Sequence, residues 1–487
     1  MATKKPKTIS KTISKTMAKK IMRNGNLTRR FLLSIPFLPM LRWSLITLPL
    51  IVTTSMATEL IKVTEVKTEL GYNVASNAAG LPSKLDNFSQ QTKLRLPPDF
   101  LTALQAVLVH HPALKGQQAE LKAFESGIDS AKGRRYPTFS AQANNLNDDD
   151  QGTLRLNQPL WAFGKIDTAI DEATAKYTAE HWRLLQTQRQ LISDTANIYA
   201  KIQGIELRII VAQQNISEHK SLHGRIFRRQ EGQLASDADA RLAYSRLLQA
   251  RSKLQRILGE KLVAQAELQA LTQVRVDTKG AIGNDLLALP TLSVVSKLVI
   301  ANNAEIRYKR EQVKVVSLNL KQEKVASLPT ISLRVEYDLF DNNTINNTNV
   351  DQTRVGLVFE SNMEGLGLVT LGRVNAAAAR INVADEEVNA VVNDIKRQVN
   401  VLMINRDVQH ELIRSQKITV EAVEATMASF IRQYNSGRKS WVEVLNNQRE
   451  LTELRLQLVE IATYWQQLSL QLLTLMGTLD DPAGLNR

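Results

Sequence analysis

Cysteine is absent from this 487-residue chain. Its absence excludes disulfides, thiol catalysis, zinc-thiolate sites and a lipid attached through an N-terminal cysteine. Aromatic residues make up only 5% of the chain, and there are 13 prolines. The rest of the composition, rich in Ala, Leu, Val, Gln and Asn, favours a helix-dominated protein.

Acidic residues are absent from the first 57 positions, which contain 11 Lys and Arg. The remaining 62 − 11 = 51 bases face 48 acids, so the formal charge of +14 falls to about +3 outside this segment. Phosphate binding without sequence preference needs a concentrated basic face. None is evident in the balanced part, and we expect no nucleic-acid partner.

The basic head is followed by an apolar run that ends in small residues, Ser55 and Ala57. This order is typical of a secretory signal peptide, predicted over 1–57 with cleavage near Ala57. The alternative is an N-terminal membrane helix, but its uninterrupted part, 43–52, is far short of the ~20 residues of a span. Residues 58–97 are polar and are predicted to form a periplasmic lead-in, and no later segment reads as a transmembrane helix.

The chain contains an internal repeat. Residues 104–140 align without a gap on 296–332, so that YPTFS at 136–140 matches LPTIS at 328–332; FGKIDTA from Phe163 further matches LGRVNAA from Leu371. Duplication on this scale predicts two equivalent halves. The expected divisions are a first repeat over 98–272, a linker over 273–290, a second repeat over 291–477 and a C-terminal tail over 478–487.

Each half is patterned in the same order. A helix of about 36 residues ends before a proline that opens a strand hairpin, and a long helix, a tight turn and a shorter helix follow. At ~1.5 Å per residue the long helices run roughly 95 to 100 Å. The expected elements are first helices over 98–134 and 291–326, long helices over 164–230 and 372–434, and turns at Gly232 and Gly437.

The strands have the length and alternation of membrane barrel strands. In the second hairpin, apolar residues from Ile331 to Leu339 alternate with polar residues from Ser332 to Asp338. Four strands cannot close alone, and an open edge is excluded from lipid. Copies must therefore pool their hairpins, giving eight strands in a dimer or twelve in a trimer. The alternative is a soluble coiled coil that carries two hairpins.

Together with this layout, QPLWAFGKIDTAIDEA at 158–173 and YNSGRKSWVEVLNNQREL at 434–451 resemble the TolC family of outer-membrane efflux proteins. The resemblance covers about 98–477. It implies a homotrimer with a transmembrane β-barrel in outer-membrane lipid and an α-helical barrel that extends into the periplasm. It also implies passive exit of substrates delivered by an inner-membrane ABC or proton-driven transporter and a periplasmic membrane-fusion adaptor. The surroundings of Trp161 look like the branch that serves type I secretion of adhesins and agglutination factors.

The resemblance also implies a periplasmic gate. The family's second tip carries Tyr-x-x-Gly and then Asp-Val-Leu-Asp, whose acids ring the mouth. Tyr434 and Gly437 match, while Glu443 and Asn446 stand at the acidic positions. A ring of Glu443 is expected to favour cations, with weak divalent block because Asn446 is neutral. The alternative is that Glu443 is a solvated helix residue.

Charged neighbours of this turn are expected to hold it closed. Arg438 and Lys439 could pair with Asp237 or Asp239 from the first half.

No motif indicates catalysis, a metal or a cofactor. His219 and His223 are four residues apart on a predicted helix but lack the glutamate of a zinc-protease motif. Thr370 breaks the GxGxxG pattern in 365–372. An export channel is therefore favoured over a periplasmic coiled-coil scaffold or adaptor, and over a secreted enzyme.

Overall fold

The computed structural model describes residues 96–146, 149–283, 288–341 and 353–485. The chain divides into Met1–Pro82 and Ser83–Arg487. The first unit lies outside the described residues, as do the predicted signal peptide, nearly all of the lead-in and most of the loop at 341–349.

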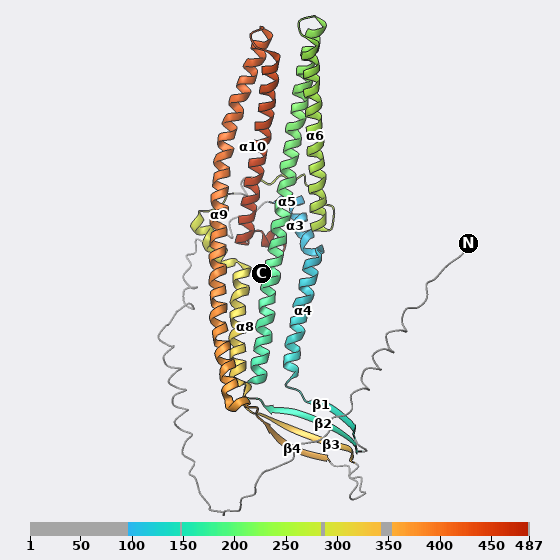
Figure 1. The fold of residues 1–487 in the computed structure, drawn as a ribbon, viewed down its shortest axis with the longest axis vertical. Coiled ribbons are helices and arrows are strands. Elements are labelled where there is room, and N and C mark those ends of the chain that lie inside the picture. Colours follow the sequence, from blue (N-terminus) through green and yellow to red (C-terminus); the bar gives the residue numbers. More distant parts are fainter. Residues whose placement is uncertain (1–95, 147–148, 284–287, 342–352, 486–487) are drawn as a thin grey trace, which may run out of the picture. The chain divides into compact units, whose positions relative to one another are not determined.

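The described part consists of two copies of a helix, hairpin and long-helix unit (Figure 1). The first copy contains α3 (Pro98–His110), α4 (Pro112–Gly133), β1 (Thr138–Leu146), β2 (Asp149–Trp161), α5 (Lys165–Glu231) and α6 (Asp237–Thr272). The second contains α7 (Leu292–Asn302), α8 (Ala304–Ala326), β3 (Thr330–Asp341), β4 (Thr353–Glu360), the 3-10 turn η3 (Glu364–Gly367), α9 (Leu368–Asn435), α10 (Trp441–Met476) and α11 (Asp480–Ala483). This arrangement confirms the predicted duplication.

The expected single helices over 98–134 and 291–326 are wrong, because each is broken once. The breaks fall at His111 and Asn303, which are related by the repeat offset and share an extended backbone with ψ of 127° and 124°. Pro112 disfavours a helical conformation at His111. No proline follows Asn303, whose side chain instead accepts a hydrogen bond from the Ile306 amide at 3.0 Å and caps α8.

The second long helix begins at Leu368, four residues before the predicted start at 372. Gly372 therefore lies inside α9, whereas Gly164 precedes α5. The sequence match between FGKIDTA and LGRVNAA is thus shifted in the structure. The residues that precede the helices are Phe163–Gly164 and Leu366–Gly367.

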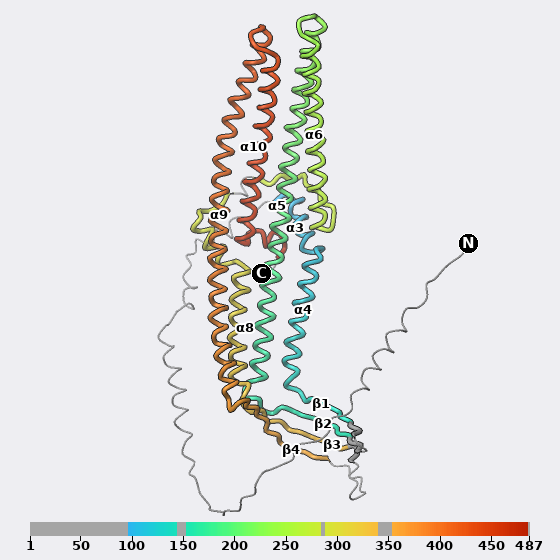
Figure 2. Tube along the Cα trace, viewed as in Figure 1, coloured from blue at the N-terminus to red at the C-terminus, as the bar shows by residue number. Residues whose placement is uncertain are grey.

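The helices lie side by side in one row, the helix curtain, which is four helices wide at each level. The long helices α5 and α9 run through both levels, and shorter helices accompany them (Figure 2). Toward the strands the order of contacts is α4, α5, α8, α9, and toward the tip turns it is α6, α5, α10, α9. Apolar side chains fill the seams, as where Ile202 and Ile205 of α5 meet Ile257 and Leu268 of α6. One outer edge is thus formed by α4 and α6, and the other by α9.

The largest core lies midway along α5 and α9, where α3, α7 and α11 pack around them. The segment assigned to a C-terminal tail contributes to it, because Leu479 and Ala483 are buried there. Asp480 is fully buried and accepts a hydrogen bond from Arg189 Nη2 at 2.6 Å. The linker is also held, since Tyr199 donates to the Gly280 carbonyl at 2.8 Å.

The four strands form one antiparallel sheet in the order β1-β2-β3-β4. Its outer strands, β1 and β4, each have one unpaired side. The sheet therefore has the same open edges as the helix curtain: β1 follows α4 on one edge, and β4 precedes α9 on the other.

Candidate functional site

The two tip turns have the same backbone at an offset of 204 residues. In the second turn the Arg438 amide donates to the Gln433 carbonyl at 2.9 Å, and in the first the Leu234 amide donates to Arg229 at 2.7 Å. Such a bond closes a helix with a left-handed residue just before the donor amide, which here is the second residue after the helix end. Gly437 takes that conformation at φ 70°, and its counterpart in the first turn, which contains Gly232 as predicted, is Gln233 at φ 58°.

Glu443, the predicted ring carboxylate, caps the helix on which it lies. It accepts hydrogen bonds from the amide and hydroxyl of Ser440 at 3.0 and 2.8 Å, and Ser440 Oγ in turn accepts from the Glu443 amide. Lys439 Nζ lies 2.5 Å from Glu443 Oε1. Lys439 first, and then the bonds from Ser440, lower the pKa of Glu443 from 4.5 to about 2. The carboxylate therefore stays charged, but its charge is compensated.

The expected pairing of Arg438 and Lys439 with Asp237 or Asp239 is not what the described residues show. Lys439 binds Glu443, four residues along the same chain segment. Asp237 accepts from Gln230 at 2.8 Å, and the Asp239 carboxylate accepts from the amide and hydroxyl of Ser236 at 3.3 and 2.8 Å. Each carboxylate meets partners close in sequence, because both tips begin with the same capping box.

A cation-π contact joins the two tips instead. The Arg229 guanidinium lies 4.8 Å from the centre of the Tyr434 ring. Burial, with Asp239 nearby, raises the pKa of Tyr434 despite the opposing effect of Arg229. Tyr434 also packs against Trp441, which is buried between the hairpins. Asn446 is exposed one turn further along α10.

A buried polar bridge that the sequence did not predict links the two helical hairpins, α5–α6 and α9–α10. It lies between the tip turns and the mid-helix core. Thr452 of α10 donates to Asn215 of α5 at 2.7 Å. Gln448 of α10 donates to Glu218 of α5, which also accepts from Arg455 at 3.0 Å. The bridge fixes α10 against α5 through specific hydrogen bonds, since buried polar groups are costly to leave unpaired.

The sheet has one apolar and one polar face, as the alternation predicted. One row across the four strands consists of Phe139, Leu156, Val335 and Val355. The residues at its two ends, Phe139 and Val355, are 67% and 65% exposed. The next row on the other face is Ser140, Arg155, Glu336 and Arg354. This two-sided pattern is that of a barrel strand with an apolar outside and a polar lumen.

Charges on the polar face compensate one another. Arg155 lies 2.5 Å from Glu336, and Arg354 lies 2.7 Å from Asp338. Arg334 lies 2.5 Å from Glu360 on the neighbouring strand. Each of these three arginines thus has a carboxylate partner on the same face.

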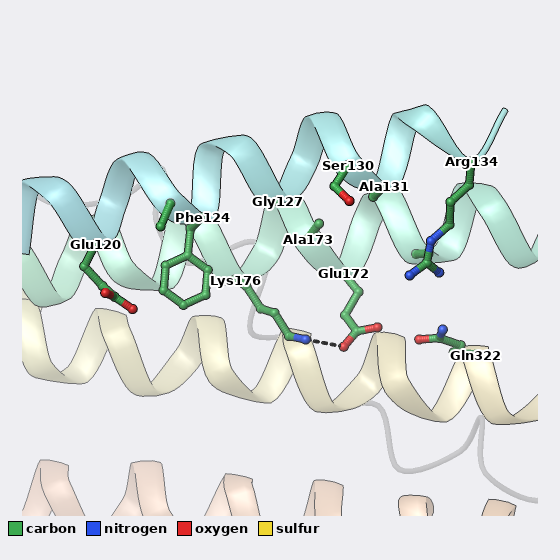
Figure 3. A pocket seen from close by; sticks show the side chains of 12 residues that line it. Glu120, Phe124, Gly127, Ser130, Ala131, Arg134, Glu172, Ala173, Lys176 and Gln322 are labelled. Atoms are coloured by element: carbon green, nitrogen blue, oxygen red, sulfur yellow. Dashed lines mark ion pairs between the residues drawn. The ribbon is translucent and has the colours of Figure 1, made fainter. Parts of the chain in front are cut away.

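A groove of about 390 Å³ lies over α5 between α4 and α8 (Figure 3). Small residues of α4 and α5, among them Gly127, Ala131 and Ala173, line it, and Lys176 and Glu172 form an ion pair of 2.7 Å across one turn. No histidine is among its lining residues. Within the described ranges no three His, Asp or Glu side chains cluster as metal ligands, and no helix there is apolar and long enough to cross a membrane.

The elements define a class: a duplicated chain with long helical hairpins and a four-stranded sheet whose faces suit lipid and water. The model of the family described as outer membrane efflux protein matches residues 103–273 and 295–478. The chain belongs to this family and is an outer-membrane efflux channel that extends into the periplasm.

Solved structures show the same fold. The channel protein CusC is 16% identical over 78% of this chain and 92% of its own, with a TM-score of 0.69. The outer membrane protein VceC of Vibrio cholerae is 16% identical over 78% and 96%, with a TM-score of 0.65. The CmeC outer membrane channel of Campylobacter jejuni is 11% identical over 83% and 91%, with a TM-score of 0.65. None of the curated proteins matches the sequence.

Proposed function

We propose that three copies of this chain close into one passive conduit. The observation that carries this proposal is that sheet and helix curtain are open at the same two edges. The free side of α9 exposes Val401, Ile404 and Val408, and α6 on the opposite edge exposes Tyr244 and Leu248. These apolar stripes suit helix packing between copies.

The number of copies follows from the width that the interior of the barrel must have. Two copies give eight strands, whose interior is just wide enough for side chains to fill. Three copies give twelve strands and leave room for water and cargo. Semi-native electrophoresis of the outer-membrane protein tests the assembly: we expect a heat-modifiable trimer, and a dimer or monomer would contradict it.

The conduit has no energy source of its own, so delivery falls to other proteins. We propose a periplasmic membrane-fusion adaptor and an inner-membrane transporter, driven by ATP or protons, as partners, and no catalytic activity in this chain. The cargo is either a protein of the type I secretion class or small molecules. Deletion of the gene, with complementation, separates these by comparison of secreted proteins and drug sensitivity.

We also propose that residues 1–57 are removed as a signal peptide, and that the hairpin loops lie outside the cell. N-terminal sequencing of outer-membrane protein should begin near Thr58. Epitopes inserted after Asp149 and after Asn346 should be accessible on intact cells, and one at Ser436 should not. If only the epitope at Ser436 were accessible, the tip turns would face outward, and the proposed orientation would be wrong.

The second tip is the proposed periplasmic gate, with Tyr434, Gly437 and Asn446 beside Glu443. Because Lys439 compensates Glu443, we expect weak cation selectivity in the unaltered channel. Lys439→Gln should uncover the carboxylates and raise cation preference in planar bilayers, whereas Glu443→Gln should lower it. If both variants leave the reversal potential unchanged, these residues do not line the constriction.

A further inference from the structure

Both long helices are preceded by a pair of left-handed residues. Phe163 and Gly164 have φ of 48° and 83° before α5, and Leu366 and Gly367 have φ of 56° and 92° before α9. A left-handed conformation is strained for residues with a side chain as large as Phe or Leu. Because this strained conformation recurs at one position of the repeat, we infer that it directs each side chain toward a packing partner.

The two side chains differ in what surrounds them. Phe163 is 40% exposed, packs edge-on against Trp161 with 5.9 Å between ring centres, and shares a groove with Leu328. Leu366 is 93% exposed. Strain that places an apolar side chain almost wholly in water has no benefit within one chain, which points to a partner.

The neighbour of Phe163 identifies that partner. Leu328 belongs to the connection that leads from α8 into β3, and β3 pairs with β2, the strand before Phe163. Leu366 follows β4, whose outer side is free. In a closed sheet the strand beside β4 is β1 of the next copy, so the residue that corresponds to Leu328 comes from the connection into β1.

That residue is Tyr136. It precedes Leu328 by the repeat offset of 192, and both stand just before the proline that opens a strand. The Tyr136 amide donates to Gly133 at 3.0 Å, and the Leu328 amide donates to the corresponding Val325 at 3.1 Å. Tyr136 is 70% exposed. Leu366 and Tyr136 are thus both exposed, and the backbone at Tyr136 is hydrogen-bonded in the same way as the backbone at Leu328.

We propose that Leu366 of one copy packs against Tyr136 of the next, at the junction between sheet and helices. The contact repeats between copies the Phe163–Leu328 neighbourhood found within each chain. It rests on the proposed closed trimer and adds a specific point of subunit recognition to it. Continuity with the free edge of β4 favours a second copy over lipid as the occupant.

The lack of native cysteine makes this contact directly testable. The pair Tyr136→Cys and Leu366→Cys is compared with Phe163→Cys and Leu328→Cys, using a series of bismaleimides of increasing length on outer-membrane protein. The shortest reagent that joins the second pair within a chain should join the first pair between chains. The expected product is a covalent trimer on denaturing gels, which neither single-cysteine variant should give.

A matched control is Tyr136→Cys with Leu328→Cys, which stand at the same repeat position and should give no covalent trimer. If trimers form on semi-native gels but residues 136 and 366 do not cross-link, the proposed contact is wrong and the proposed trimer stands. Absence of any trimer in the unaltered protein overturns the assembly itself.

Leu366→Gln should also lower the temperature at which the trimer dissociates, and Leu366→Met should restore it. This pair keeps the proposal testable if the cysteine variants assemble poorly. Quenching of Leu366→Trp fluorescence by brominated lipid would show that lipid occupies the site and would overturn the proposal.

Discussion

The buried ion pair between Arg189 and Asp480 should dominate the stability of the mid-helix core. The carboxylate is fully buried, the Arg189 side chain is 10% exposed, and Arg189 also donates to the Asn302 carbonyl at 2.6 Å. Asp480→Asn leaves the guanidinium charge buried without a counter-charge. Removing one partner of such a pair typically costs ~3–5 kcal/mol.

The cost can be converted into a melting temperature. Unfolding entropy of ~2.1 cal/mol/K per residue over roughly 370 residues gives ~0.8 kcal/mol/K, so Asp480→Asn should lower Tm by ~4–6 °C. Circular dichroism of the detergent-solubilised protein measures this shift. Asp129→Asn is the matched control, because the Asp129–Lys132 pair is 75% and 55% exposed and should contribute less than ~1 kcal/mol.

The double variant Arg189→Met with Asp480→Leu separates pairing from packing. Replacing a whole buried pair by apolar residues is often neutral, so most of the lost stability should return. If Asp480→Asn melts with the unaltered protein, or if the double variant is as unstable as the single one, the pair does not act as described.

Three further outcomes follow from the tips and the sheet. Gln233→Gly should stabilise the first tip and Gly437→Gln should destabilise the second, because only glycine takes the left-handed conformation without strain. Each change should be ~0.5–1 kcal/mol in the free energy of opening measured by hydrogen exchange. Changes of the same sign in the two variants would refute this. The capping contribution of Glu443, whose pKa is lowered from 4.5 to about 2, should be complete well above pH 4.5 and lost progressively as the pH falls from 4.5 to about 2, so the protection of the first turn of α10 against amide exchange, relative to an unstructured chain at the same pH, should stay constant from pH 7 to pH 6 and fall below pH 4.5. Glu336→Gln leaves Arg155 and Arg354 in one row without the shared carboxylate, which should shift bilayer reversal potentials toward anions at low salt, and Leu357→Gln on the apolar face should not produce that shift.

The sequence was most informative where a pattern is local. Alternation from Ile331 to Asp338 predicted the two faces of β3. Ser-x-x-Glu at 440–443 was also a readable signal, typical of a capping box. Reading it would have placed Glu443 at the start of a helix and given the carboxylate a structural role.

Features that depend on distant residues had no such signal. Arg189 and Asp480 are 291 positions apart, and no period or motif relates them. The break at Asn303 lacks the proline that marks its counterpart at His111, so only the repeat offset could have revealed it. Gln233 could not be recognised as left-handed, because that conformation is normally inferred from glycine.

Duplication has kept the backbone of the two tips and changed their side chains. The turns share their closing hydrogen bonds and capping boxes, yet the first position of the following helix is Asp237 in one tip and Trp441 in the other. The Asp237 side chain is 68% exposed, whereas Trp441 is 4% exposed and packs between the hairpins. The second tip is therefore anchored by an apolar core, and the first presents charge to water. In the proposed trimer these tips alternate around the periplasmic end, so a partner that binds there meets three sites of each kind, and threefold docking is favoured over sixfold docking.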